Sequence, residues 1–485
     1  MKTDLAFSFL PVTCDSTKTT KGSTFVACDG TRLRGIDFIP SAIQQGATRI
    51  IADIKYQSDL EQIEQENPAI MFSYVINPRQ VLAEEAAKAH GYPAKKLRVI
   101  GVTGTKGKSS TTHLIEHILK TAGHKTALIG GVANKILDTK LQSSLTTPNS
   151  DFLQAFFAAC VEQGVDTVVM EVSSHALSLD RTYGIEFDTI GFTNLAPDHL
   201  DFYDNSMQAY CDAKLLLFNQ LKSTGKAIIN LDHIWRDYVV ANATQVLESH
   251  QIITLSSHHQ EADTRMSIKE NNLDGLHLLI SQAQAAISLN LSSTYLFGIP
   301  YAYNIAMAAL ICQSMNISNE VIAAGISSFA GTPGRLQLHV LKNGAKAFVD
   351  FAHNGPSMEA VLQMLRPLTD NLIVVFGCGG DRPKERRQFM AQSAAKFSDQ
   401  IIITEDNPRT EDRFQILRDV AANIPTDALK KTRTIQDRRE AINSAVKMAT
   451  TPSSIVAILG KGHEPYQIIG TTYYHFDDYE EIRRF

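Results

Sequence analysis

A glycine-rich segment, TGTKGKSS at residues 103–110, constrains the fold of this chain more than any other feature. It follows the β-branched run 98–102 and precedes the helical pattern 111–121, so the sequence predicts a strand, a loop and a helix. Glycines let the backbone close around an anion that the N–H groups of a helix N-terminus also face. We therefore expect a nucleotide phosphate to bind here, with Lys108 reaching the outer phosphates and Ser109 or Ser110 available to ligate magnesium.

The loop departs from the general phosphate-loop pattern at one position. That pattern asks for glycine five residues before Gly107, and Val102 stands there instead. The alternative interpretation is a tight turn with an incidental lysine. The strand pattern before the loop and the helical pattern after it favour phosphate binding.

Bulk composition limits the classes of protein to which the chain can belong. Its 485 residues exceed what a single hydrophobic core organises, so we expect several domains. The formal net charge of −5 argues against a nucleic-acid or membrane-binding surface, and six scattered cysteines without a C-x-x-C pair indicate a reducing compartment. Without a signal-peptide pattern or a membrane-spanning run, the sequence predicts a cytoplasmic protein that acts on small molecules.

Three segments, 1–97, 98–331 and 332–485, are the predicted domains. The second and third alternate β-rich runs with helical patterns, which predicts an α/β fold with a doubly wound, mostly parallel sheet and ligands at the carboxyl ends of its strands. The expected strands are 24–28, 49–52, 99–102, 126–129, 167–171, 189–193, 227–230, 347–351, 372–376, 400–404 and 455–459, and the expected helices are 80–90, 111–121, 152–163, 207–221, 386–397 and 438–449.

Charged side chains gather where strands of the middle segment are expected to end. Glu171 stands at the end of strand 167–171, and a carboxylate is a preferred ligand of magnesium. The loop 194–201 follows another strand and carries Asp198, His199 and Asp201, although a solvated turn would have the same composition. Lys214 lies beside a leucine run, where a lysine ordinarily extends to solvent.

Seven motifs, taken in order, resemble the Mur ligases. They are GTKGKSS at 104–110, TTP at 146–148, EVSSHAL at 171–177, the run 198–214, GRLQ at 334–337, DNPR at 406–409 and GKGHE at 460–464. The resemblance spans the chain and implies a three-domain architecture. Its parts are a UDP-binding N-terminal domain, a central ATPase domain with a doubly wound, mostly parallel sheet, and a Rossmann-like C-terminal domain that binds an amino acid.

The resemblance implies an ATP-dependent amide ligase of peptidoglycan synthesis. A substrate carboxylate would attack the γ-phosphate of ATP to give an acyl phosphate, and an amine would then displace the phosphate. By the same resemblance Lys214 is carbamylated and supports a second magnesium ion, because a neutral amine can react with carbon dioxide. The implied catalytic residues are Lys108, Glu171, His199 and Lys214; metal would bind Ser109, Glu171, His199 and Lys214; and ATP would contact Gly104, Thr105, Lys106, Gly107, Lys108, Ser109, Ser110, Asn304, Arg335 and Asp350.

The second implied substrate is UDP-N-acetylmuramoyl-L-alanyl-D-glutamate. Two stretches differ from the family pattern: residues 350–357 read DFAHNGPS where DYAHTPD is usual, and Leu179 replaces a common glutamine. These changes put contacts to ribose, adenine and the acceptor peptide in doubt. The residues that match the family's UDP-sugar-peptide contacts are Ser16, Thr31, Arg32, Thr146, Thr147, Ser173 and Arg181.

By the same resemblance, the DNPR motif implies meso-diaminopimelate as the amino acid that is added, because family members that add it carry DNPR. That molecule carries a second carboxylate, which an arginine grips with two parallel hydrogen bonds where lysine or alanine cannot. Arg409 is therefore the expected specificity residue, although an ion pair with Glu411 or Asp412 is a local alternative. The full expected pocket is Arg382, Asp406, Asn407, Pro408, Arg409, Gly460 and Glu464.

Other functions remain open from the sequence. They are a ligase that adds L-lysine, a folylpolyglutamate synthase, which shares a GTxGK loop but lacks DNPR and a domain like 1–97, and a non-catalytic scaffold. The residues that argue against the scaffold are the intact Lys108, Glu171, His199, Lys214 and Arg409. We expect a monomer with no nucleic-acid or membrane partner.

Overall fold

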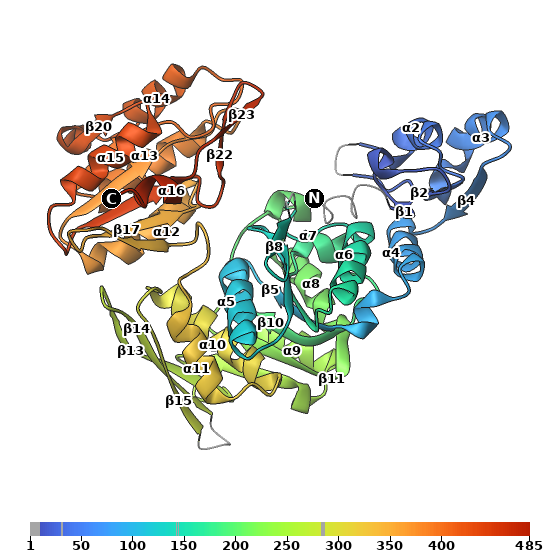
Figure 1. The fold of residues 1–485 in the computed structure, drawn as a ribbon, viewed down its shortest axis with the longest axis horizontal. Helices are drawn as coiled ribbons and strands as arrows, with labels where there is room; N and C mark the ends of the chain where they lie inside the picture. Colours follow the sequence, from blue (N-terminus) through green and yellow to red (C-terminus); the bar gives the residue numbers. More distant parts are fainter. Residues whose placement is uncertain (1–9, 31–32, 142, 144, 283–286) are drawn as a thin grey trace. The chain divides into compact units, whose positions relative to one another are not determined.

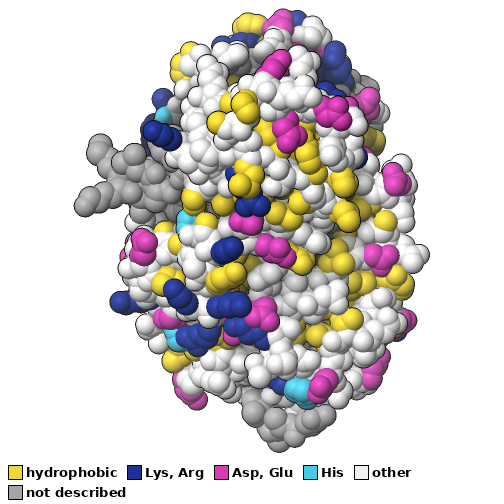
Figure 2. Space-filling view, turned by 90° about the vertical axis from the view of Figure 1, so that its right-hand side faces the viewer, with side chains coloured by type: hydrophobic (Ala, Val, Ile, Leu, Met, Phe, Trp, Pro, Cys, Tyr) yellow, Lys and Arg dark blue, Asp and Glu magenta, His cyan; other side chains and the backbone are white. Residues whose placement is uncertain are grey.

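Two compact units make up the chain in this computed structural model, which describes residues 10–485 except 31–32, 142, 144 and 283–286 (Figure 1). The first unit comprises Met1–Met266, Ile280–Leu289 and Asn304–Gly325, and the second comprises Ser267–Leu279, Asn290–Tyr303 and Ile326–Phe485. Acidic, basic and hydrophobic side chains are mixed over the face in Figure 2. No helix of the described part is long and apolar enough to cross a membrane.

The first unit begins with a four-stranded parallel sheet, coloured blue in Figure 1. Successive side chains of a strand point to opposite faces, so Phe25 and Ile50 pack in one buried cluster while Val26 and Ile51 pack in another. The elements are β1 (Val12–Thr13), β2 (Thr24–Val26), β3 (Arg49–Asp53), β4 (Met71–Val75), α2 (Ile39–Gln44), α3 (Gln57–Glu66) and α4 (Pro78–Ala89).

A larger sheet follows, in the strand order β12-β11-β10-β5-β9-β6-β7-β8, with parallel pairing from β12 through to β6. Its central strands are β5 (Arg98–Thr103), β9 (Thr167–Glu171) and β10 (Phe187–Phe192), which lie side by side. The others are β6 (Thr126–Ile129), β7 (Asn134–Ile136), β8 (Thr139–Leu141), β11 (Leu221–Asn230) and β12 (Ile252–Ser256), with helices α5 (Lys108–Thr121), α6 (Ser150–Glu162), α7 (Ser174–Ser178), α8 (Met207–Leu215), α9 (Arg236–Val246), α10 (Ile299–Ser314) and α11 (Asn319–Ser328).

The register of strand pairing places the carboxyl ends of the central strands together. Val102 pairs with Glu171, and Phe192 pairs with Thr103, so the segments that follow β5, β9 and β10 leave from one edge of the sheet. On the far side of β12 the sheet continues through β13 (Thr264–Asn272), β14 (Gly275–Gln282) and β15 (Ile287–Ser293).

The second unit contains a six-stranded sheet in the order β16-β17-β21-β18-β19-β20. All its neighbours pair in parallel except β16 with β17. The elements are β16 (Gln337–Val340), β17 (Lys346–Asp350), β18 (Leu372–Phe376), β19 (Gln400–Ile403), β20 (Thr432–Thr434), β21 (Ile455–Leu459), α12 (Gly355–Leu365), α13 (Glu385–Phe397), α14 (Arg413–Ala422), α15 (Arg438–Met448) and α16 (Asp478–Ile482), with a separate hairpin of β22 (Tyr466–Ile469) and β23 (Thr472–His475).

The predicted α/β class with mostly parallel sheets is confirmed, and, apart from helix 207–221 and strand 227–230, each expected strand and helix is present within a few residues of its predicted ends. One helix is shorter than expected. The segment 207–221 is α8 only as far as Leu215, after which a 3₁₀ turn, Leu216–Gln220, buries Leu217 and Phe218 in the core. β11 then begins at Leu221, where a helix was expected to end.

Candidate active site

The glycine loop is built as the sequence predicts, between β5 and α5. Gly104 and Gly107 adopt φ values of 135° and 88°, which side-chain-bearing residues rarely tolerate. A Cβ on Gly107 would lie 2.6 Å from Asn304 Oδ1, so the glycine also makes room for that side chain. Asn304 in turn accepts a hydrogen bond from Thr111 Oγ1 at 3.3 Å, which brings the predicted ATP residues of the first unit together.

Lys108 lies over the loop that it belongs to. Its Nζ donates to the carbonyl oxygens of Gly104 at 2.9 Å and Thr105 at 3.1 Å. The segment after β10 braces the same loop, because Thr193 Oγ1 donates to the carbonyl of Lys106 at 2.7 Å and Asn194 accepts from the Lys106 amide at 3.0 Å. The loop is therefore fixed in shape, with a helix N-terminus and a cation at its open side.

Lys214 does not extend to solvent, so that alternative is wrong. Its side chain is 1% exposed, its Nζ donates to the Gly104 carbonyl at 3.1 Å, and the Tyr210 ring centre lies 4.4 Å away. Burial, reinforced by the Lys108 charge, holds the pKa of Lys214 well below its usual value. A neutral amine next to the phosphate loop is the form that can react with carbon dioxide.

Glu171 is buried at the end of β9, where its Oε1 accepts a hydrogen bond from the Gly131 amide at 3.0 Å. His199 is more exposed, and its ring meets that of His175 at a centroid distance of 5.2 Å. Within the described residues, no three His, Cys, Asp or Glu side chains form a cluster that could hold a metal ion. The donor chemistry still suits magnesium: Glu171 offers a carboxylate and Ser109 a hydroxyl.

Three residues expected at the muramoyl peptide meet beside Glu171. Thr147 Oγ1 donates to the Glu171 carbonyl at 2.9 Å and accepts from the Ser173 amide at 3.0 Å, while Arg181 Nη1 donates to the Thr147 carbonyl at 2.9 Å. The buried Nε of Arg181 has no hydrogen-bond partner among the described residues. Thr146 lies close by, since a Cβ on Gly131 would be 3.2 Å from its Oγ1.

The expected UDP residues are described only in part. Ser16 is buried in the 3₁₀ turn Ser16–Lys18, while Thr31 and Arg32 lie outside the described residues. The sequence did not predict a role for Asp151, which accepts hydrogen bonds from Thr13 Oγ1 at 2.8 Å and the Cys14 amide at 3.2 Å. Asp151 thereby ties the small blue sheet to the start of α6.

Arg335 and Asp350 lie close together in the second unit. Asp350 accepts from the amides of Leu336 at 2.7 Å and Ala352 at 2.8 Å, and Arg335 lies over the Phe351 ring at 5.0 Å. Burial raises the pKa of the Asp350 carboxyl. This arrangement is compatible with the nucleotide contacts that the sequence predicts.

The expected amino-acid pocket is a cavity of about 260 Å³ in the second unit. Of the seven residues predicted for it, only Pro408 does not line it; Arg382, Asp406, Asn407, Arg409, Gly460 and Glu464 do. Burial and the neighbouring Asp406 carboxylate raise the pKa of Glu464, so this end of the pocket favours a bound cation. Arg382 and Arg409 line the same cavity and carry positive charge, which favours a bound carboxylate.

Arg409 forms no ion pair in the part of the chain that the structure describes, so the local alternative is wrong. Glu411 pairs with Arg387 at 2.7 Å, and Asp412 pairs with Arg418 at 3.7 Å. Arg409 Nη1 instead donates to the Gly380 carbonyl at 2.9 Å inside the cavity. The guanidinium keeps donors for a ligand.

Comparisons with known proteins identify the family of this chain. Models of three Mur ligase domains match the chain: "Mur ligase family, catalytic domain" at 11–98, "Mur ligase middle domain" at 102–312, and "Mur ligase, glutamate ligase domain" at 334–462. A UDP-N-acetylmuramoyl-L-alanyl-D-glutamate--2,6-diaminopimelate ligase from Clostridium tetani is 36% identical over 475 residues, covering 97% of this chain and 93% of the relative. The chain belongs to the Mur ligase family.

Solved structures extend the similarity to the fold. A ligase of the same printed name is 30% identical to this Mur ligase with a TM-score of 0.70, covering 98% of this chain and 94% of the other. A folylpolyglutamate synthase from Thermotoga maritima, at 17% identity and a TM-score of 0.62, covers 78% of this chain and 89% of its own, and shares the fold alone.

The sequence did not predict several residues that line or support the pocket of this Mur ligase. Arg386 and His353 line the same cavity as Arg409, and the basic run after Arg382 was the available signal for Arg386. Arg387 is buried and holds Glu411 and Asp419, at 2.7 and 2.5 Å, which fixes the segment after DNPR. No local pattern marks Arg387 as buried, because its partners lie 24 and 32 residues away.

A glycine pair tests the shape of the phosphate loop. Gly107→Ala and Gly123→Ala both place a side chain at φ near 88°, but open space surrounds Gly123, whereas Gly107 faces Asn304. We expect Gly107→Ala to weaken ADP binding at least about tenfold and Gly123→Ala to change it less than about twofold, although both lose ~1–2 kcal/mol of stability. Titration calorimetry and thermal unfolding measure these effects, and equal ADP affinities would contradict the role of Gly107.

Proposed function

We propose that this chain is the ATP-dependent ligase that joins meso-diaminopimelate to UDP-N-acetylmuramoyl-L-alanyl-D-glutamate in peptidoglycan precursor synthesis. One observation carries the proposal: the lining of a single cavity contains the basic side chains of Arg382 and Arg409 and the acidic side chains of Asp406 and Glu464. A ligand with ammonium groups and a second carboxylate matches that distribution. The name of the Clostridium tetani relative, a UDP-N-acetylmuramoyl-L-alanyl-D-glutamate--2,6-diaminopimelate ligase, supports the same pair of substrates.

Charge neutralisation is the main task in the proposed reaction. The acceptor carboxylate attacks the γ-phosphate of ATP, forming an acyl phosphate and releasing ADP; the amine then attacks the acyl carbon and phosphate leaves. Both steps concentrate negative charge. Lys108 and the N-terminus of α5 are placed in this chain to stabilise that charge, and Asn304 supports the loop that carries them.

Magnesium is the metal proposed for the site. Ser109 and Glu171 would hold one ion through oxygen donors, which suit a hard cation, and a carbamylated Lys214 with His199 would support a second. Bound there, the metal would neutralise phosphate charge. Arg335 and Asp350 are proposed to contact the nucleotide from the third domain, and Ser16, Thr31, Arg32, Thr146, Thr147, Ser173 and Arg181 to hold the UDP-linked substrate.

Selection of the amine is assigned to the pocket of the second unit. Arg409 would receive the far carboxylate of meso-diaminopimelate through paired charge-assisted hydrogen bonds, and Glu464 would receive an ammonium group. L-lysine lacks that carboxylate and would leave the guanidinium without its partner. We further propose domains at 1–97, 98–331 and 332–485, a monomeric state and a cytoplasmic location.

Phosphate release tests the proposed function. The purified protein with ATP and magnesium should release phosphate only when UDP-N-acetylmuramoyl-L-alanyl-D-glutamate and meso-diaminopimelate are both present, and mass spectrometry should detect the amide product. L-lysine in place of meso-diaminopimelate should give a much slower reaction. Folded, ADP-binding protein that forms no amide would refute the assignment and leave the scaffold alternative.

Replacement of Arg409 tests the specificity residue. Arg409→Ala should raise the KM for meso-diaminopimelate about 10- to 100-fold, because a charge-assisted hydrogen bond contributes ~1.5–3 kcal/mol. Arg418→Ala is the matched control, since Arg418 is exposed and pairs with Asp412 outside the pocket. Steady-state kinetics with each substrate varied would show the effect, and an unchanged KM in Arg409→Ala would remove Arg409 from its assigned role.

Carbon dioxide tests the state of Lys214. The lowered pKa of the buried Lys214 amine favours reversible carbamate formation, so activity should fall in buffer freed of carbon dioxide and recover when bicarbonate is added. Lys214→Arg should lose activity about 100-fold or more and gain nothing from bicarbonate. Full activity of the wild-type protein without carbon dioxide would show that carbamylation is not needed.

A further inference from the structure

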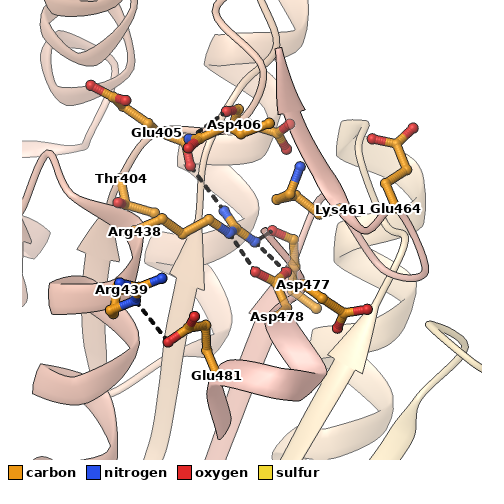
Figure 3. A network of polar contacts seen from close by, with 12 residues as sticks. Thr404, Glu405, Asp406, Arg438, Arg439, Lys461, Glu464, Asp477, Asp478 and Glu481 are labelled. Carbon is orange, nitrogen blue, oxygen red and sulfur yellow. Dashed lines mark hydrogen bonds and ion pairs between the residues drawn. The ribbon is translucent and has the colours of Figure 1, made fainter. Parts of the chain in front are cut away.

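A fully buried ion pair is drawn in the same view as residues of the amino-acid pocket (Figure 3). Arg438, the first residue of α15, donates from Nε and Nη2 to the two carboxylate oxygens of Asp478, the first residue of α16, at 2.7 Å each. Both side chains are 0% exposed. The pocket residues Asp406 and Glu464 are drawn around this pair in the same view.

The guanidinium of Arg438 has two further partners, and both are backbone carbonyls. Nη1 donates to the Glu405 carbonyl and Nη2 to the Leu459 carbonyl, each at 3.1 Å. Glu405 immediately precedes the DNPR segment, and Leu459 immediately precedes the GKGHE segment. One side chain therefore joins the starting points of the two segments that supply Arg409 and Glu464 to the lining of the pocket.

Contacts between the two segments make their relative position matter. Asn407 Nδ2 donates to Glu464 Oε2 at 2.9 Å, and Lys461 Nζ donates to Asn407 Oδ1 at 3.3 Å. A Cβ on Gly460 would lie 2.6 Å from Asp406 Oδ2, so the Asp406 carboxylate occupies the space that a side chain at position 460 would need. A shift of either starting point would change the distance between Glu464 and Arg409 across the cavity.

We propose that Arg438, oriented by Asp478, is a positioning residue that sets the spacing of the DNPR and GKGHE segments and thereby the affinity for the incoming amino acid. The identity of that amino acid rests on the proposed function. The free energy of folding does not explain why this ion pair is present, because apolar residues of similar size often replace a buried ion pair with little or no loss of stability. The planar fork of arginine, by contrast, bonds a carboxylate and two carbonyls at fixed angles.

A neighbouring pair provides the matched control. Arg439 Nε donates to Glu481 Oε2 at 2.9 Å and so also links α15 to α16. Arg439 is exposed, and among the described residues its side chain makes no hydrogen bond or ion pair with either pocket segment. Arg439→Met/Glu481→Leu removes a link between the same helices. It should leave the pocket unchanged.

The test compares this control with Arg438→Met/Asp478→Leu, in which neither buried charge is left without its partner. We expect the Arg438/Asp478 double variant to stay folded, to raise the KM for meso-diaminopimelate at least about tenfold, and to change the KM for ATP less than about twofold. Amide hydrogen exchange over residues 405–411 and 459–465 should quicken in this variant only.

Each outcome decides the proposal. An unchanged KM and unchanged exchange in the double variant would overturn it, and so would an equal rise in both KM values or the same effects in the control. If the double variant does not fold, Arg438→Lys decides: its single ammonium keeps the charge but cannot reproduce the fork, so a wild-type KM and exchange would also overturn the role. Should the wild-type protein form no amide at all, the proposed function fails, while the exchange comparison still tests the positioning.

Discussion

Parallel pairing of β5 with β9 and β10 is the constraint on which the first site depends. It places Val102 opposite Glu171 and Phe192 opposite Thr103, so three segments separated by many residues leave from one edge of the sheet. The phosphate loop, the carboxylate of Glu171 and the bracing residues Thr193 and Asn194 meet for this reason. A shift of one residue in either pair would turn these side chains to the other face.

Desolvation shapes the chemistry at that edge. Lys214 is among the largest fully buried side chains of the described structure, and its Nζ donates to the Gly104 carbonyl. A charged ammonium is costly in such a place, which is why its pKa is lowered. Burial thus prepares a reactive amine within reach of the same loop backbone that Lys108 contacts.

The sequence predicted the structure correctly where a feature depends on residues close by in the chain. Gly107, Glu171 and Arg409 each stand in a short motif or at the end of a β-rich run, and the parallel strands then bring them to the expected places. It failed where an outcome depends on distant partners. The 3₁₀ turn Leu216–Gln220 is set by core packing, and the burial of Arg438 is set by Asp478, 40 residues further on. Arginine is mostly exposed in folded proteins, and nothing adjacent to Arg438 in the sequence indicates its burial.

The backbone of Arg409 shows how the second site depends on such distant contacts. Its φ of 53° is left-handed, a conformation that costs a residue with a side chain ~1–2 kcal/mol. The hairpin of β22 and β23 offsets that cost: the Arg409 amide donates to the Ile468 carbonyl at 3.0 Å, and the Gly470 amide donates to the Arg409 carbonyl at 2.7 Å. A relaxed backbone would direct the guanidinium elsewhere, so the motif supplies the arginine while the hairpin supplies its direction.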